Sequence, residues 1–340
     1  MRKRLGVALF VLVLLGASAA ALAALGWREL NAPLSIAAAE GEWLRVPSGK
    51  SFRGVAKELE QRGLLDKAWL LALYARATGE ATQVRAGEYQ LMPGTTPVTL
   101  LAKLVAGDVY LHQITIVEGS RFAEALAALR ANPAIAATDL DGPAIMSALG
   151  APGVHPEGQF FPDTYRFPYG TSDLEILRIA HEALVARLQE AWRNRSPDLL
   201  LKTDYDALIM ASIIEKETSL PAERKLIAGV FHERLRRNMR LQTDPTVIYG
   251  IGDAFDGDLR DADMRRDTPY NTYTRAGLPP TPIALPGAGS IEAAVAPEVT
   301  GALYFVATGR GDGSHHFSAT LEEHEQAYRD YVRALRSQPQ

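Results

Sequence analysis

The most apolar stretch of the chain runs from Leu5 to Trp27 and contains no charged residue. A helix of about 23 residues is about 34 Å long, which is enough to cross a hydrocarbon core of about 30 Å. Basic residues at positions 2–4 precede the stretch, and positive charge stays on the cytoplasmic side of a membrane. The pattern therefore predicts a single membrane anchor, with a cytoplasmic N-terminus and everything after Arg28 on the far side.

A cleaved signal peptide is the alternative for the same stretch. Ala17, Ser18 and Ala19 offer the small-x-small pattern that a signal peptidase accepts. The apolar run nevertheless continues through Leu25, whereas the apolar region of a signal peptide is usually about 7–15 residues long. The uncleaved anchor is the favoured interpretation.

Three segments repeat one pattern, which is a short β-prone run, a turn with glycine and an apolar helix. Because each helix must cover one face of the strands, the pattern predicts small α+β units. The first two segments resemble the LysM type of glycan-binding module. The repeats run from residues 44–52 into a helix at Val55, from 89–97 into a helix at Leu100, and from 114–122 into a helix at Ala125.

A second domain follows a region rich in glycine, proline and aromatic residues. Residues 142–170 are too broken for a long helix, and their rings are suited to packing at a domain junction or, less favoured, to stacking on sugars. Apolar residues then recur at helical spacing, except in one segment that is apolar nearly all round and is expected to be a buried helix. The predicted elements are helices at 174–194, 207–214, 223–237 and 321–335, irregular backbone at 279–286, and a strand at 302–307.

The pattern divides the chain into six parts and predicts an α+β fold with a mixed α/β domain at the C-terminal end. The parts are a cytoplasmic tail (1–4), a transmembrane anchor (5–27), a linker (28–43), a LysM-like module (44–107), a connecting α+β segment (108–150) and the domain that carries the candidate chemistry (151–340).

Composition and charge exclude several functions. The chain has no cysteine, so a disulfide framework, a thiolate metal site and a cysteine nucleophile are impossible. A net charge of −4 with mixed signs argues against nucleic acid as a partner, and the basic stretch from Arg234 to Arg237 is interpreted as the solvated side of a helix. His315, His316 and His324 lack the spacing of a metal site, so neither a metal nor another cofactor is expected.

Two carboxylates end the buried helix, and only one of them can face a given cleft. Glu215 and Glu217 point about 200° apart on a helix. A carboxylic acid in an apolar setting keeps its proton near neutral pH and can deliver it to the leaving oxygen of a glycosidic bond. Glu217 suits this role because it lies where the helix ends against Thr218. Glu215 is either a supporting hydrogen-bonding residue or, slightly favoured, a surface ion-pair partner.

Polar and aromatic residues suited to acetamido and hydroxyl groups follow the helix. Asp244 is equally compatible with two roles, a second catalytic carboxylate and a turn residue that bonds the backbone two residues on. Core packing is the alternative for one of Tyr270 and Tyr273. The candidate substrate-binding residues are Gln242, Thr243, Asp244, Thr246, Tyr270, Asn271, Thr272 and Tyr273.

Three blocks of sequence, at 211–218, 241–250 and 270–273, have the order and wording of a known family. From about Asp204 to the C-terminus the chain resembles the YceG-like family, the endolytic murein transglycosylases. The resemblance implies an inner-membrane protein with a periplasmic catalytic domain. It further implies peptidoglycan strands as substrate and peptidoglycan synthases as candidate partners. Thr281 and Leu285 stand where the family usually has Gly and Asn, so substrate details of that loop stay open.

The resemblance also implies a mechanism with one carboxylate. Related lytic transglycosylases use the Glu of a Glu-Ser pair that closes a buried helix, and Glu217-Thr218 matches that pair. The same carboxylate would protonate the glycosidic oxygen and then draw a proton from the 6-hydroxyl of N-acetylmuramate, which closes into a 1,6-anhydro sugar. Two other functions stay open, a hydrolysing muramidase with Glu217 and Asp244, and a non-catalytic cell-wall scaffold.

Overall fold

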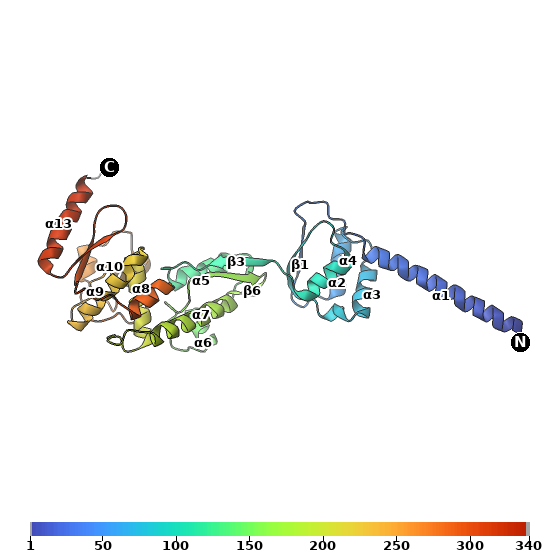
Figure 1. Cartoon of the computed structure of the whole chain (residues 1–340), viewed down its shortest axis with the longest axis horizontal. Coiled ribbons are helices and arrows are strands. Elements are labelled where there is room, and N and C mark those ends of the chain that lie inside the picture. The colour runs from blue at the N-terminus through green and yellow to red at the C-terminus, as the bar shows by residue number, and fades with distance from the viewer. Residues whose placement is uncertain (1, 338–340) are drawn as a thin grey trace. The chain divides into compact units, whose positions relative to one another are not determined.

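The computed structural model describes residues 2–337, with side chains from residue 10 to 336, and divides into two compact units. The first unit contains the chain up to His112 and the segment Arg166–Thr171, and the second contains Gln113–Tyr165 and the chain from Ser172 onward. Figure 1 shows the order of the elements. The sequence pattern predicts a separate connecting segment at 108–150. In the structure most of this segment belongs to the second unit.

The first unit begins with a long helix and continues as a strand–helix–helix–strand unit. β1 and β2 pair antiparallel, with Leu44 opposite Tyr89, and both of these side chains are fully buried against the helices. Ser51 begins the first of these helices by accepting a hydrogen bond from the Gly54 backbone N–H at 3.2 Å. The elements are α1 (Arg2–Leu30), β1 (Glu42–Val46), α2 (Phe52–Gln61), α3 (Ala68–Ala77), η1 (Glu80–Thr82), β2 (Gly87–Leu91) and α4 (Pro97–Ala106).

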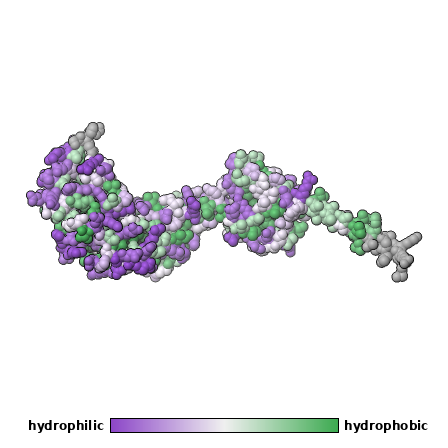
Figure 2. Space-filling model, in the orientation of Figure 1, coloured by the Kyte–Doolittle hydropathy of each residue, from purple (hydrophilic) through white to green (hydrophobic). Residues whose placement is uncertain are grey.

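The apolar stretch at the N-terminus is helical, as its pattern predicts. Residues Phe10–Leu30 of α1 are long and apolar enough to cross a membrane, and none of the most apolar part is buried in the protein. Figure 2 shows hydrophobic colouring along this helix. Length and composition therefore fit a membrane anchor.

The second unit is mainly helical, and its strands form only short pairs. Within residues 2–337 the strands make four two-stranded sheets, β1–β2, β3–β5, β4–β6 and β7–β8. The mixture of helices and small sheets fits the predicted α+β class. The elements are β3 (Leu111–Thr115), α5 (Phe122–Ala131), β4 (Ile135–Ala136), α6 (Gly142–Ala148), β5 (Thr164–Pro168), β6 (Thr171–Ser172), α7 (Asp173–Arg193), α8 (Asp204–Glu217), η2 (Pro221–Glu223), α9 (Arg224–Arg236), α10 (Asp244–Ile251), η3 (Gly252–Ala254), α11 (Asp261–Arg265), α12 (Ala288–Val295), β7 (Tyr304–Ala307), β8 (His315–Ser318) and α13 (Leu321–Ser337).

Helix α8 forms the centre of this unit, and α7, α9 and α12 pack around it. Every residue from Ala207 to Ile214 is buried, which confirms the predicted all-round apolar helix. The predicted helices at 174–194, 223–237 and 321–335 correspond to α7, α9 and α13. The aromatic residues Phe160 and Phe161 at the domain entry are buried, in agreement with the favoured packing role.

We expect Gly229→Ala to lower the free energy of unfolding by about 1–2 kcal/mol. Gly229 lies inside α9, where a Cβ would overlap the backbone carbonyl of Glu298. Overpacking costs about 1–3 kcal/mol and outweighs the helix preference of alanine, which is about 1 kcal/mol. The matched control is Gly54→Ala in α2, where a Cβ meets nothing closer than 3.4 Å. Denaturant unfolding measures both, and equal stability of the two variants would contradict the expectation.

Candidate active site

Helix α8 positions Glu217 as its last residue. At the other end, Thr203 and Asp206 cap the helix reciprocally, because each side chain accepts a hydrogen bond of 3.0 Å from the backbone N–H of the other. At the C-terminal end Thr218 leaves the helical conformation, with φ −142° and ψ 136°. Thr218 is buried, and its hydroxyl accepts a hydrogen bond of 3.0 Å from the Leu220 backbone N–H. Thr218 thus turns the chain directly behind the acid.

The Glu217 carboxyl lies in the wall of a cavity of about 390 Å³. Burial raises the pKa of this group from 4.5 to about 7, and the charge of Asp244 acts in the same direction. The Thr243 hydroxyl donates a hydrogen bond to Glu217 Oε1, and this bond opposes part of the rise. The lining residues are Glu217, Arg234, Leu241, Gln242, Thr243, Asp244, Tyr273, Tyr304, Phe305, Leu321 and His324. Near neutral pH about half of the molecules therefore hold a protonated acid.

Glu215 lies outside this cavity and has a structural role. Its side chain is only 6% exposed, with Oε1 3.7 Å from an Arg224 nitrogen. Oε2 accepts a hydrogen bond of 2.9 Å from the Gly287 backbone N–H. The favoured interpretation as a surface ion pair is therefore wrong about exposure, because the loop around residue 287 covers this side of α8. The alternative, a supporting hydrogen-bonding residue, describes it.

Four of the predicted substrate-binding residues line the cavity, namely Gln242, Thr243, Asp244 and Tyr273. The Tyr273 hydroxyl donates a hydrogen bond of 2.5 Å to Asp244 Oδ1. Burial, with this bond, raises the pKa of Tyr273, so the phenol stays protonated. Asp244 is the first residue of α10, so the turn, which was one of the two roles left open for it, is wrong. The backbone continues as a helix with Pro245 in its first turn.

Two buried threonines hold the backbone of Thr243 in place. Thr246 Oγ1 donates to the Thr243 carbonyl at 2.7 Å, and Thr272 Oγ1 accepts from the Thr243 N–H at 3.1 Å. Their own hydroxyls are 2.9 Å apart, and both residues are at most 3% exposed. In place of the predicted substrate contact, we assign Thr246 and Thr272 a positioning role, because they fix the residue that bonds Glu217.

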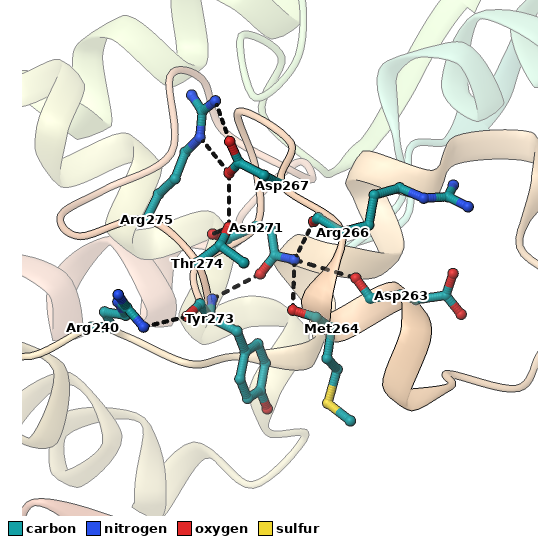
Figure 3. A network of polar contacts seen from close by, with 9 residues as sticks. All are labelled: Arg240, Asp263, Met264, Arg266, Asp267, Asn271, Tyr273, Thr274 and Arg275. Carbon is teal, nitrogen blue, oxygen red and sulfur yellow. Dashed lines mark hydrogen bonds and ion pairs between the residues drawn. The ribbon is translucent and has the colours of Figure 1, made fainter.

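Asn271 and Tyr270 also lie outside the cavity lining. The Asn271 side-chain amide donates hydrogen bonds to three backbone carbonyls of the segment 263–266, at 3.2, 2.9 and 2.6 Å (Figure 3). Its Oδ1 accepts from the Tyr273 backbone N–H at 2.8 Å, so Asn271 holds the loop that carries Tyr273. Tyr270 packs on the core and bonds Thr281 at 2.8 Å, which makes it the packing tyrosine of the pair.

The structure corrects the interpretation of Arg234, which is buried and lines the cavity. The stretch 234–237 was predicted to be solvated throughout, but only Arg236 and Arg237 are exposed. Arg234 follows the buried Val230 and Phe231 by one helical turn, and this spacing could have revealed it. Tyr304, Phe305, Leu321 and His324 of the wall come from β7 and α13 and have no local signal in the sequence.

The histidines serve packing and hydrogen bonding. His315 Nδ1 lies 2.7 Å from Glu223 Oε2, and its backbone N–H donates to Glu223 Oε1 at 2.8 Å. His324 stacks on Tyr304, with ring centroids 5.1 Å apart. Among the residues that the structure describes, no three side chains of metal-binding type form a group.

A carboxylic acid with a pKa near 7, open to a polar cavity with aromatic walls, is typical of enzymes that use general acid–base catalysis on a polar substrate. The site of this protein has the features of that class of enzyme. The sequence profile of the YceG-like family matches residues 44–330. The chain belongs to the YceG-like family.

Relatives of the chain carry one name. The chain is 33% identical to a protein of Bacillus subtilis (strain 168) that is named endolytic murein transglycosylase. The match covers 85% of this chain and 84% of the relative. A protein of the same name from Streptococcus pneumoniae serotype 2 is 27% identical over 84% of this chain and 58% of the relative. The crystal structure of a yceG-like protein from Listeria monocytogenes matches with a TM-score of 0.53 and 29% identity, covering 85% of this chain and 99% of that one.

Proposed function

We propose that the protein is an endolytic peptidoglycan lytic transglycosylase that cleaves the β-1,4 bond between N-acetylmuramate and N-acetylglucosamine. Relatives named endolytic murein transglycosylase support the substrate class. The observation that carries the proposal is the position of Glu217, whose acid has a pKa of about 7 and opens into the cavity. Cleavage of nascent strands beside the membrane would end their elongation.

The reaction needs one group that first gives and then takes a proton. Protonated Glu217 donates to the glycosidic oxygen, and the bond from that oxygen to C1 of N-acetylmuramate breaks. The Thr243 hydroxyl stabilises the carboxylate that results, because it donates to Oε1. The carboxylate then accepts the proton of the 6-hydroxyl while that oxygen bonds to C1. Glu217 thereby regains its proton, and the products are a 1,6-anhydro end and a strand whose leaving oxygen has become a free 4-hydroxyl.

A hydrolysing muramidase is the second candidate, because Asp244 lines the same cavity as Glu217. Ordinary glycosidases use two carboxylates, and the second would activate water or attack C1. Asp244 Oδ1 already accepts the hydrogen bond from the Tyr273 hydroxyl, so one of its two oxygens is held by the protein, and this favours the transglycosylase.

Mass spectrometry of digested glycan strands tests the proposed function. We expect anhydromuramyl ends. Each is lighter than a reducing end by one water molecule, about 18 Da, because the transglycosylase reaction adds no water. Reducing ends would select the muramidase, and the absence of cleavage would select a non-catalytic scaffold.

We further propose that α1 anchors the protein in the inner membrane, with the second unit in the periplasm. The length and apolar composition of Phe10–Leu30 support the proposal. We expect the mature protein to remain in the membrane fraction with its N-terminus intact. Sequencing of the mature N-terminus measures this, and a soluble protein that starts at Ala20 or later would contradict the anchor.

We propose a glycan-binding role for the first unit, in keeping with its LysM-like sequence pattern. The strand–helix–helix–strand order of β1, α2, α3 and β2 around its own core supports a self-contained module. Removal of residues 44–107 is expected to weaken retention on insoluble peptidoglycan while the second unit stays folded. A pull-down with and without these residues measures retention, and equal retention would point to protein contacts instead.

A further inference from the structure

Arg234 is a buried cation that neutral acceptors hold in place. Its side chain lies in α9, and the residue is 8% exposed. Nε donates to the Leu303 carbonyl at 2.7 Å, and Nη1 donates to the carbonyls of Arg240 at 3.2 Å and Leu241 at 2.9 Å. Nη1 also lies 3.3 Å from Gln242 Oε1. Two of the three guanidinium nitrogens are therefore committed to the protein, and the plane of the group is fixed.

The third nitrogen, Nη2, remains available. It has no hydrogen-bond partner among the side chains of residues 10–336 or the described backbone, and it is not among the side-chain atoms that are sealed from solvent without a partner. Within the described part of the chain, no carboxylate lies within 4.0 Å of the guanidinium. Arg234 lines the cavity that holds Glu217. Because Nη2 is not bonded to the described protein, its N–H groups are the ones left to bind a substrate there.

Aromatic side chains form the wall of the cavity beside Arg234. The guanidinium carbon lies 5.2 Å from the centre of the Tyr304 ring, and His324 stacks on the same ring. Nδ1 of His324 is buried and has no partner among the described residues. A fixed guanidinium with a free edge, and no carboxylate of the described residues in direct contact with it, favours an oxygen acceptor, above all a carboxylate. Glu217 lies close enough to interact with its charge but is not bonded to it.

We infer that Arg234 is a specificity-determining residue that binds the lactyl carboxyl group of the N-acetylmuramyl ring. The inference rests on the proposed function. Acetamido and hydroxyl groups occur on both sugars of the strand, whereas the lactyl group occurs only on N-acetylmuramate. It is a carboxylate in peptide-free strands and an amide carbonyl where a peptide stem is attached. Binding it beside Glu217 places the ring whose C1 and 6-hydroxyl must react next to the acid.

Binding without turnover tests the inference, in the Glu217→Gln protein. The two probes are a peptide-free tetrasaccharide of alternating N-acetylglucosamine and N-acetylmuramate, and the same compound with its lactyl carboxyls reduced to alcohols. We expect the probe with reduced lactyl groups to bind with a Kd about 10- to 100-fold higher, which is the range for loss of a charge-assisted hydrogen bond. In the Glu217→Gln/Arg234→Gln protein the two probes are expected to bind within about threefold of each other.

Three outcomes would overturn the inference. Equal binding of the two probes by the Glu217→Gln protein would show that the lactyl carboxyl is not recognised. An equal loss in both proteins would assign recognition to another residue. If thermal melting shows that Arg234→Gln does not fold, Arg234→Lys replaces it, and full discrimination by that variant would also contradict a role for the guanidinium geometry. Failure of the proposed function is separate, because it appears as the absence of anhydro ends from the unaltered protein.

Discussion

Glu217→Gln is expected to abolish glycan cleavage while the fold and glycan binding remain. The amide has the size and polarity of the acid, but it neither donates a proton to the glycosidic oxygen nor accepts one from the 6-hydroxyl. General acid–base help is worth roughly 10²–10⁴-fold, and one group serves both steps here, so a loss of at least about 10⁴-fold is expected. The release of anhydromuramyl products measures the rate, and retention on insoluble glycan measures binding.

Glu215→Gln is the matched control on the same helix, because it makes the same chemical change two residues earlier. Its side chain bonds the Gly287 N–H and approaches Arg224, outside the cavity. We expect a loss of stability of about 1–3 kcal/mol and a loss of activity below about tenfold, since an ion pair is broken but no proton transfer is removed. If Glu215→Gln were inactive and Glu217→Gln active, the catalytic assignment would have to be exchanged.

Cleavage is expected to fall as the pH rises through about 7. The first step needs protonated Glu217, whose pKa burial raises from 4.5 to about 7. The rate should drop about tenfold for each pH unit above that value, because the protonated fraction does. A pH–rate profile measures this with Glu217→Gln as the blank. A rate that keeps rising from pH 7 to pH 9 would contradict Glu217 as the acid.

The same shift predicts how stability depends on pH. Between pH 4.5 and 7 the folded state holds a proton that the unfolded state has released, so this stabilisation is complete below pH 4.5 and is lost as the pH rises through 7. The difference corresponds to about 3 kcal/mol. Glu217→Gln should therefore be more stable than the unaltered protein at pH 8, with a gap that closes towards pH 4. Denaturant unfolding at the two pH values measures it.

Periodicity alone predicted much of the fold. The apolar helix at the N-terminus, the buried helix α8 and the longer helices α7, α9 and α13 lie where the pattern of apolar residues places them. Helix α10 was missed because Asp244 and Pro245 are typical of both a turn and the first turn of a helix. The domain boundary also differs, because residues 113–165 pack with the chain from Ser172 onward and not with the first unit.

By itself the sequence determined the helix that carries the acid and the residue at its end, because a run that is apolar on all sides is stable only inside a core. Only the tertiary structure decided which polar residues surround Glu217. Thr243 bonds it across 26 positions, and Arg234 bonds Leu303 across 69. Thr246, Asn271 and Thr272 are of the same polar residue types as side chains that bind a ligand. In the structure they are buried and point into the protein. The spacing of apolar residues along the sequence indicates whether a side chain is buried. The partner that this side chain contacts depends on how distant segments of the chain pack.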